Sequence, residues 1–259
     1  MADELVHRTV DNGIATITLD SPHNRNALSA RLRMELRAAL TASIDENSVR
    51  VVVLDHTGPV FCAGMDLKES RDEESTEEQG VRDLPALLEQ IWTSPKPVVT
   101  KLAGPARAGG IGLVAASDIA VAADTATFAF SEVRIGVVPA TISVTVLPVL
   151  DTRQAHELFL TGEKFDAGRA ASIGLLNSAV PAEQLDAEVT RYTDMLALGG
   201  PKALAATKEM LHRPRPTKLS DDFAEMLALS AEHFAGEEGK EGIRAFSEKR
   251  RPSWAPRPS

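Results

Sequence analysis

The chain has 259 residues, 43% of them hydrophobic, and a formal net charge of −9. Its length suffices for one large hydrophobic core, and its acidic balance argues against a general nucleic-acid or polybasic membrane surface. The single cysteine excludes an internal disulfide framework, and the scattered histidines indicate no metal site. Because the N-terminus has no apolar signal segment, we expect a cytoplasmic protein without nucleic-acid or membrane partners.

The N-terminal half of the chain predicts strands and helices in alternation. Residues 9–19 alternate in polarity around an Asn-Gly pair, a pattern typical of a β-hairpin. Ser29 is a candidate N-cap for a helix reaching about Ile44, and residues 49–54 form a β-branched run typical of a buried strand. Further helices are expected over 84–92, 111–117, 141–149 and 153–160, and further strands over 95–102, 119–122 and 127–131.

Two regions depart from this alternation. Residues 69–80 are almost purely polar, and we expect them to form a mobile, solvated loop. Residues 183–246 carry helical patterns with little strand character. We therefore divide the chain into an α/β core of residues 1–195 and a helical C-terminal subdomain of residues 196–259.

Two glycine-containing turns each follow a predicted buried strand. They are Ala63-Gly64-Met65 and Ala108-Gly109-Gly110. The first N–H groups of a helix have no internal acceptors and lie at the positive end of the helix dipole. Two such helix starts that converge would offer two donors to one oxygen, the arrangement of an oxyanion hole. Taken singly, each turn is better explained by a tight turn and close packing, so the functional prediction rests on the pair.

Glu132 is the candidate proton shuttle. In residues 127–132, period-2 alternation places Phe128, Phe130 and Glu132 on one face. Burial beside the two rings would raise the carboxyl pKa toward neutrality and suit it to proton transfer. The alternative is that the strand ends at Ser131 and that Glu132 points into water.

Five segments of the chain, in order and at fitting spacing, resemble the crotonase superfamily, the enoyl-CoA hydratases and isomerases. The resemblance runs from about residue 8 to residue 252. It implies a crotonase-type α/β fold, a spiral core of ββα turns with a helical C-terminal subdomain that assembles trimers or dimers of trimers. The five segments are Arg25–Leu28, Phe61–Leu67, Ala108–Asp118, Phe128–Gly136 and Glu241–Arg250.

The resemblance also implies a ligand and its contacts. The substrate would be an acyl-CoA thioester, with no separate cofactor and no metal. Its thioester oxygen would accept hydrogen bonds from the backbone N–H groups of Met65 and Gly109, and Glu132 would move the proton. The positions implied to contact CoA, of which the last two sometimes act in a neighbouring subunit, are Arg25, Ala27, Leu28, Ala63, Asp66, Leu67, Lys68, Phe246 and Lys249.

One position departs from the family pattern. The best-known hydratases use two glutamates; one matches Glu132, but the other matches Gly112, which has no carboxylate. The sequence around both positions nevertheless resembles bacterial relatives assigned as hydratases, so hydration of a 2-enoyl-CoA is the leading prediction. Isomerisation of a 3-enoyl-CoA to a 2-enoyl-CoA needs only one base and is the first alternative. A catalytically silent acyl-CoA binder is the second.

Overall fold

The computed structural model describes residues 4–66, 69, 74–213 and 219–255, and only the backbone of 74–82, 219–222 and 224. A six-stranded sheet lies at the centre, in the order β1-β2-β3-β4-β6-β9. The first two strands form an antiparallel hairpin, and every other neighbouring pair is parallel. The strands are β1 (Val6–Asp11), β2 (Ile14–Leu19), β3 (Val51–His56), β4 (Val98–Leu102), β6 (Ile119–Ala123) and β9 (Ser178–Val180).

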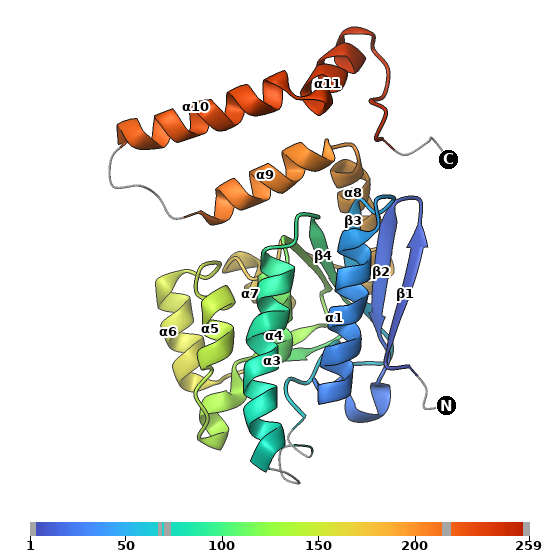
Figure 1. Cartoon of the computed structure of the whole chain (residues 1–259). Coiled ribbons are helices and arrows are strands. Elements are labelled where there is room, and N and C mark those ends of the chain that lie inside the picture. The colour runs from blue at the N-terminus through green and yellow to red at the C-terminus, as the bar shows by residue number, and fades with distance from the viewer. Residues whose placement is uncertain (1–3, 67–68, 70–73, 214–218, 256–259) are drawn as a thin grey trace.

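The central strands are buried on both faces of this sheet. In β3, Val52 and Leu54 belong to one hydrophobic cluster, whereas Val51 and Val53 belong to a second. Because successive side chains of a strand point to opposite faces, an unbroken apolar run covers both. Helices α1 (Ala30–Asp45), α3 (Glu74–Trp92) and α4 (Gly109–Ala116) supply the first cluster, and α8 (Leu185–Ala197) supplies the second (Figure 1).

A smaller sheet of order β5-β7-β8 adjoins the central one. Its short strands are β5 (Ala106–Arg107), β7 (Thr127–Ala129) and β8 (Phe165–Asp166), and its middle strand pairs parallel with the first and antiparallel with the last. Three further helices belong to this part of the chain: α5 (Ala140–Val146), α6 (Thr152–Thr161) and α7 (Ala167–Ser172). The 3₁₀ segments are η1 (Pro22–Asn24), η2 (Ser131–Ile135) and η3 (Ala182–Gln184).

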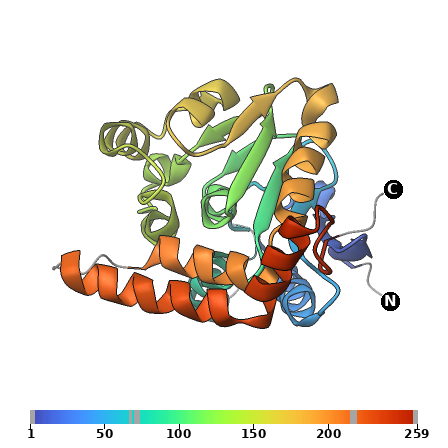
Figure 2. The same cartoon turned by 90° about the horizontal axis from the view of Figure 1, so that it is seen from above.

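Three helices form the C-terminal part: α9 (Pro201–His212), α10 (Leu219–Ala235) and α11 (Glu237–Ser247). Helix α10 lies over α9, on the side away from the sheet (Figures 1 and 2). Lys208 of α9 is buried, and its Nζ donates to Oδ2 of Asp118 at 2.8 Å and to the carbonyl of Ile91 at 3.0 Å. A buried ion pair therefore ties α9 to the core. Within the described residues, no helix is long and apolar enough to cross a bilayer.

Several local predictions are confirmed and two are wrong. The side chain of Ser29 caps α1 by accepting from the N–H of Leu32 at 3.3 Å. The predicted loop over 69–80 is wrong for residues 74–80, which open helix α3, because Glu and Gln are good helix formers even on a solvated face. The predicted strand over 127–131 ends at Ala129 and gives way to η2, since its ladders with β5 and β8 end there.

Candidate active site

The two glycine turns leave the central sheet at the same edge. Strands β3 and β4 are parallel neighbours; residues 57–66 follow the first and residues 103–108 follow the second. Because the carboxyl ends of parallel strands meet at one edge, the two segments emerge side by side. They also pair directly: Cys62 forms a parallel bridge with Ala106, and the N–H of Arg107 donates to the Cys62 carbonyl at 3.0 Å.

The small sheet brings a third segment into register with these two. Ala106 of β5 pairs in parallel with Phe128 of β7, and the first turn pairs with the same Ala106 on its other side. Three chain segments therefore leave one row of paired residues in the same direction. Met65 and Gly109 follow this row by three residues, and Glu132 follows it by four. The three predicted catalytic residues consequently emerge at one edge of the small sheet.

The two turns touch through their glycines. A Cβ added at Gly64 would lie 2.9 Å from the Cβ of Ala108 and 3.4 Å from the N atom of Gly109. A Cβ added at Gly109 would lie 3.0 Å from Cδ1 of Leu28. Gly64 also has a φ of +90°, in the region that favours glycine. The close approach of the turns thus depends on the absence of a side chain at Gly64, whereas a side chain at Gly109 would crowd Leu28.

Both candidate donors belong to peptide planes that are held at their carbonyl ends. The Gly64 carbonyl, in the same peptide as the N–H of Met65, accepts from the N–H of Leu28 at 2.7 Å. The Ala108 carbonyl, in the same peptide as the N–H of Gly109, accepts from the first turn of α4 at 2.9 Å. Because a trans peptide is planar with N–H opposite C=O, each bond fixes the direction of its donor. Among the described residues, neither of the two donors meets an acceptor.

Ala108, which precedes the second donor, has an unusual backbone conformation. Its φ is 47° and its ψ is −120°, and its N–H donates to the carbonyl of Ala129 at 3.3 Å. Such a conformation costs a non-glycine residue about 1–3 kcal/mol and persists where the surroundings enforce it. Contacts with β7 and α4 therefore enforce the conformation of Ala108, which its intrinsic backbone preference would not favour.

Glu132 lies in η2, so the prediction that strand alternation aligns it with Phe128 and Phe130 is wrong. Both phenylalanines are nevertheless fully buried. Glu132 itself is half-buried, and its Oε2 has no hydrogen-bond partner among the described residues. Burial raises the pKa of the Glu132 carboxyl above the ordinary glutamate value. A carboxylate with one unpartnered oxygen and a raised pKa is suited to accept and return a proton.

The position that departs from the family pattern is filled by apolar side chains. A Cβ added at Gly112 would lie 2.8 Å from Cγ2 of Ile142 and 3.3 Å from Cδ1 of Leu88. Gly112 lies one helical turn after Gly109 on α4, and Gly112, Ile142 and Leu88 are all buried. The site therefore has an apolar wall where the best-known hydratases carry their second glutamate. One sequence could not reveal this, because Ile142 and Leu88 come from separate helices.

The N-terminal segment predicted to contact CoA does lie along the first turn. The Arg25 carbonyl accepts from the N–H of Ala63 at 3.1 Å, and Nδ2 of Asn24 donates to Asp66 at 3.1 Å. The Arg25 side chain is exposed, whereas Ala27 and Leu28 are buried and support the turn from beneath. Sequence reasoning gave no role to the side chain of Asn26.

The Asn26 side chain organises this segment from a buried position. Its Oδ1 accepts from the N–H of Ser21 at 2.7 Å, and its Nδ2 donates to the carbonyls of Thr57 and Val60 at 3.0 and 2.9 Å. An Asn that satisfies three backbone groups fixes the loop that leads into the first turn. Its neighbours in the sequence motif were the only available signal.

Two of the predicted CoA-contacting residues lie outside the described part of the chain, and two others belong to its C-terminal end. Leu67 and Lys68 lie outside the described residues. Phe246, in α11, is 87% exposed, and Lys249 follows that helix. No contact between either residue and the two turns occurs within the described part of the chain. The family-derived role for them stays a prediction.

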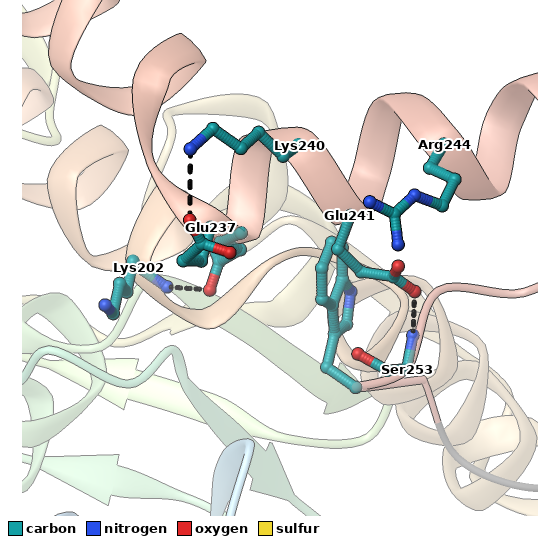
Figure 3. A pocket seen from close by; sticks show the side chains of 8 residues that line it. Lys202, Glu237, Lys240, Glu241, Arg244 and Ser253 are labelled. Carbon is teal, nitrogen blue, oxygen red and sulfur yellow. Dashed lines mark hydrogen bonds and ion pairs between the residues drawn. The ribbon is translucent and has the colours of Figure 1, made fainter.

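Two surface hollows bear on the choice of site. A cavity of about 420 Å³ near the start of α9 and α11 is lined by charged groups that partner one another, with Lys240 Nζ 3.0 Å from Glu237 (Figure 3). It contains none of the residues of the turns or of η2. A second cavity of about 420 Å³ lies between α3 and α5, and Leu88 lines it together with Trp92 and Val144. The apolar wall beside Gly112 therefore adjoins this second, largely apolar cavity.

The central sheet, the small sheet beside it and the helices packed around them form a fold of the crotonase class. The crystal structure of an enoyl-CoA hydratase from Mycobacterium smegmatis matches the chain with a TM-score of 0.90 and 33% identity, covering 97% of this chain and 99% of that one. The predicted α/β crotonase-type fold is thereby confirmed.

The chain belongs to the enoyl-CoA hydratase/isomerase family, whose family model matches residues 9–257. It is 33% identical over 255 residues to the human enoyl-CoA hydratase domain-containing protein 3, mitochondrial, covering 95% of this chain and 82% of that protein. It is also 30% identical over 255 residues to carnitinyl-CoA dehydratase of Proteus mirabilis, covering 96% and 97%. The chain is therefore an acyl-CoA-processing enzyme of the crotonase family.

Proposed function

We propose that the protein is an enoyl-CoA hydratase in which Glu132 is the single acid/base residue. The observation that carries this proposal is the half-buried Glu132 carboxylate, unpartnered at Oε2, at the edge to which the free N–H groups of Met65 and Gly109 are also delivered. Relatives named as hydratase and dehydratase support the choice of reaction, since dehydration is hydration in reverse.

In the proposed reaction, Glu132 accepts a proton from water as the water oxygen bonds to C3 of the enoyl group. The C2=C3 electron pair moves toward the thioester, and the oxygen that gains negative charge is held by the N–H groups of Met65 and Gly109. The protonated Glu132 then gives the proton to C2, and the thioester carbonyl re-forms. The product, a 3-hydroxyacyl-CoA, contains all atoms of the substrate and of one water molecule, and Glu132 is ionised again.

Isomerisation is the second candidate, and the apolar wall at Gly112 favours it. With Ile142 and Leu88 filling the place of a second carboxylate, water has one polar partner instead of two. One base can remove a proton from C2 of a 3-enoyl-CoA and return it at C4. The same two N–H groups would stabilise the intermediate enolate.

One pair of assays separates the candidates. The purified protein receives a 2-enoyl-CoA or a 3-enoyl-CoA, and the absorbance of the conjugated enoyl thioester is followed. Loss of absorbance from the first substrate supports hydration, and a gain from the second supports isomerisation. Acyl-CoA binding without either change would contradict both and support the silent binder. The matched control for Glu132→Gln is Glu183→Gln, because Glu183 is an exposed glutamate of η3.

We further propose that CoA binds along Arg25 and Ala63, with Phe246 and Lys249 serving the site of a neighbouring subunit in a trimer. Two observations support this: the Arg25 backbone is bonded to Ala63 of the first turn while the residue is exposed, and Phe246 is exposed on α11. Analytical ultracentrifugation tests the trimer. A trimer-free enzyme with full activity would contradict the shared site.

A further inference from the structure

Arg33 is a buried charged residue that has no role in the reaction proposed above. It lies in α1 and is 1% exposed, and its Nε and Nη2 have no hydrogen-bond partner among the described residues. Among the described side chains, Asp83 forms a long ion pair with it: the carboxylate is half-exposed and 3.9 Å from Nη2, which is too far for a hydrogen bond. A buried guanidinium with incomplete pairing is costly, and desolvation lowers its pKa. Packing of the hydrophobic core alone therefore does not explain an arginine at this position.

The one short hydrogen bond of Arg33 leads directly to the first turn. Nη1 donates to the carbonyl of Leu28 at 2.5 Å, and the same nitrogen lies 4.0 Å from Sδ of Met65. Leu28 also donates its N–H to the Gly64 carbonyl at 2.7 Å. That carbonyl shares its peptide plane with the N–H of Met65. Arg33 thus holds the residue that sets the direction of the first donor.

Leu28 also touches the second turn. Its Cδ1 would lie 3.0 Å from a Cβ at Gly109, and it forms a parallel bridge with Met65. A displacement of Leu28 would therefore shift both donors relative to each other. The guanidinium adds positive charge beneath the place where negative charge develops on the thioester oxygen, and in a poorly solvated site such a charge acts strongly.

Two described carboxylates oppose the charge of Arg33. Glu69 accepts from the N–H of Ala30 at 2.8 Å, so that its charge lies at the start of α1. Asp83, on α3, is half-exposed and therefore partly screened. The start of α1 contributes positive dipole charge of the same sign as Arg33. Of these groups, Arg33 is the one whose side chain is buried and contacts Met65.

We propose that Arg33 is a positioning residue of the oxyanion hole: it holds Leu28 so that the Met65 N–H faces the thioester oxygen, and its charge polarises the bound thioester. This inference rests on the proposed oxyanion role of Met65 and Gly109, but not on which reaction follows. It assigns to a buried arginine a contribution to catalysis without contact with substrate.

The test uses the full-length protein and 2,4-hexadienoyl-CoA, whose absorbance shifts to longer wavelength when its thioester carbonyl is polarised. The variants are Arg33→Met, Arg33→Gln and Arg33→Lys. The matched control is Arg31→Met, since Arg31 lies on the same helix and pairs with Glu35 at 2.7 Å. The neutral variants are expected to lose most of the shift and at least about tenfold in kcat, with KM changed less than about threefold.

Arg33→Lys is expected to be intermediate, because it retains the charge without the guanidinium contact to Leu28, and Arg31→Met is expected to match the wild type. A folded Arg33→Met with the full spectral shift and full kcat would overturn the inference. If the neutral variants failed to fold, Arg33→Lys would decide, since unchanged shift and kcat would equally overturn it. If the wild type shifts the absorbance but does not turn over 2- or 3-enoyl-CoA, the proposed reaction is contradicted. The positioning role of Arg33 in the oxyanion hole would still stand.

Discussion

Gly112 and Ile142 share one space: a Cβ on the first would lie 2.8 Å from Cγ2 of the second. Two helices, α4 and α5, thus meet at a point where one residue has no side chain and the other has a branched one. The size of each residue is determined by the other. A carboxylate cannot be restored at position 112 without removing Ile142.

Gly112→Glu is therefore expected to lower the free energy of unfolding by more than the about 1–3 kcal/mol typical of an overpacked core, because it also buries a carboxylate. Gly112→Glu with Ile142→Gly is expected to recover part of this loss. Urea unfolding of the wild type, both single variants and the double variant gives the coupling energy. Strictly additive effects would contradict a shared space.

Glu132→Gln is expected to reduce turnover of the wild-type substrate about 10²- to 10⁴-fold, the range for a lost general acid/base. It is also expected to raise the thermal midpoint at neutral pH, because it removes a half-buried charge whose Oε2 has no hydrogen-bond partner among the described residues. The raised pKa sets this sign: the ionised carboxylate opposes folding above the pKa that Glu132 has in the unfolded chain. A lower midpoint, or retained turnover, would argue against the role assigned to Glu132.

The pH profile of kcat/KM follows from the same pKa. Burial raises the pKa of Glu132, and only the ionised form accepts a proton. Activity is therefore expected to fall, as the pH is lowered, at a higher pH than the value of about 4.3 for an ordinary glutamate. The residual activity of Glu132→Gln should lack this acid limb. An acid limb at the ordinary glutamate value would mean that another group is the base.

Gly64→Ala is expected to destabilise the protein more than Gly136→Ala. Both glycines have positive φ, at +90° and +74°, so both substitutions carry a similar backbone penalty of about 1 kcal/mol. A Cβ at Gly64 would strike Ala108 at 2.9 Å, whereas a Cβ at Gly136 meets nothing within 4 Å. The difference between their unfolding free energies measures the contact between the turns. Equal losses would show that the turns can move apart freely.

Lys208→Met is expected to cost about 3–5 kcal/mol, because it leaves Asp118 without its buried cation. Adding Asp118→Asn should recover part of the loss. Denaturant midpoints for the two single variants and the double variant check this. A small loss for Lys208→Met would mean that water replaces the ammonium group at Asp118.

The sequence predicted those local conformations that depend on one or two residues. The cap at Ser29 and the turn glycines are of this kind, because one or two residues decide their conformation. The order of the strands in the sheet could not be predicted from the sequence. The glycine turns that follow β3 and β4 nevertheless suggested that two backbone donors meet at one place. The family resemblance supplied the donors at Met65 and Gly109, and the geometry is compatible with them.

The parts that sequence reasoning missed depend on contacts between distant segments. The helix predicted over 84–92 begins ten residues earlier, because α3 runs from Glu74 to Trp92 with Pro85 inside it. The roles of Ile142 and Arg33 exist only because α5 and α1 face α4 and the first turn. Neither residue belongs to a recognisable motif, so only the assembled fold could single them out.

The bond between Lys208 and Asp118 has a consequence for how the chain is made. Synthesis proceeds from the N-terminus, and 90 residues separate the two partners. Until α9 leaves the ribosome, the nascent sheet holds a carboxylate whose cation does not yet exist, and domains fold as units during synthesis. A protein truncated before Lys208 would therefore contain an Asp118 carboxylate without its ion-pair partner. Such a chain is expected to be less stable than the complete protein.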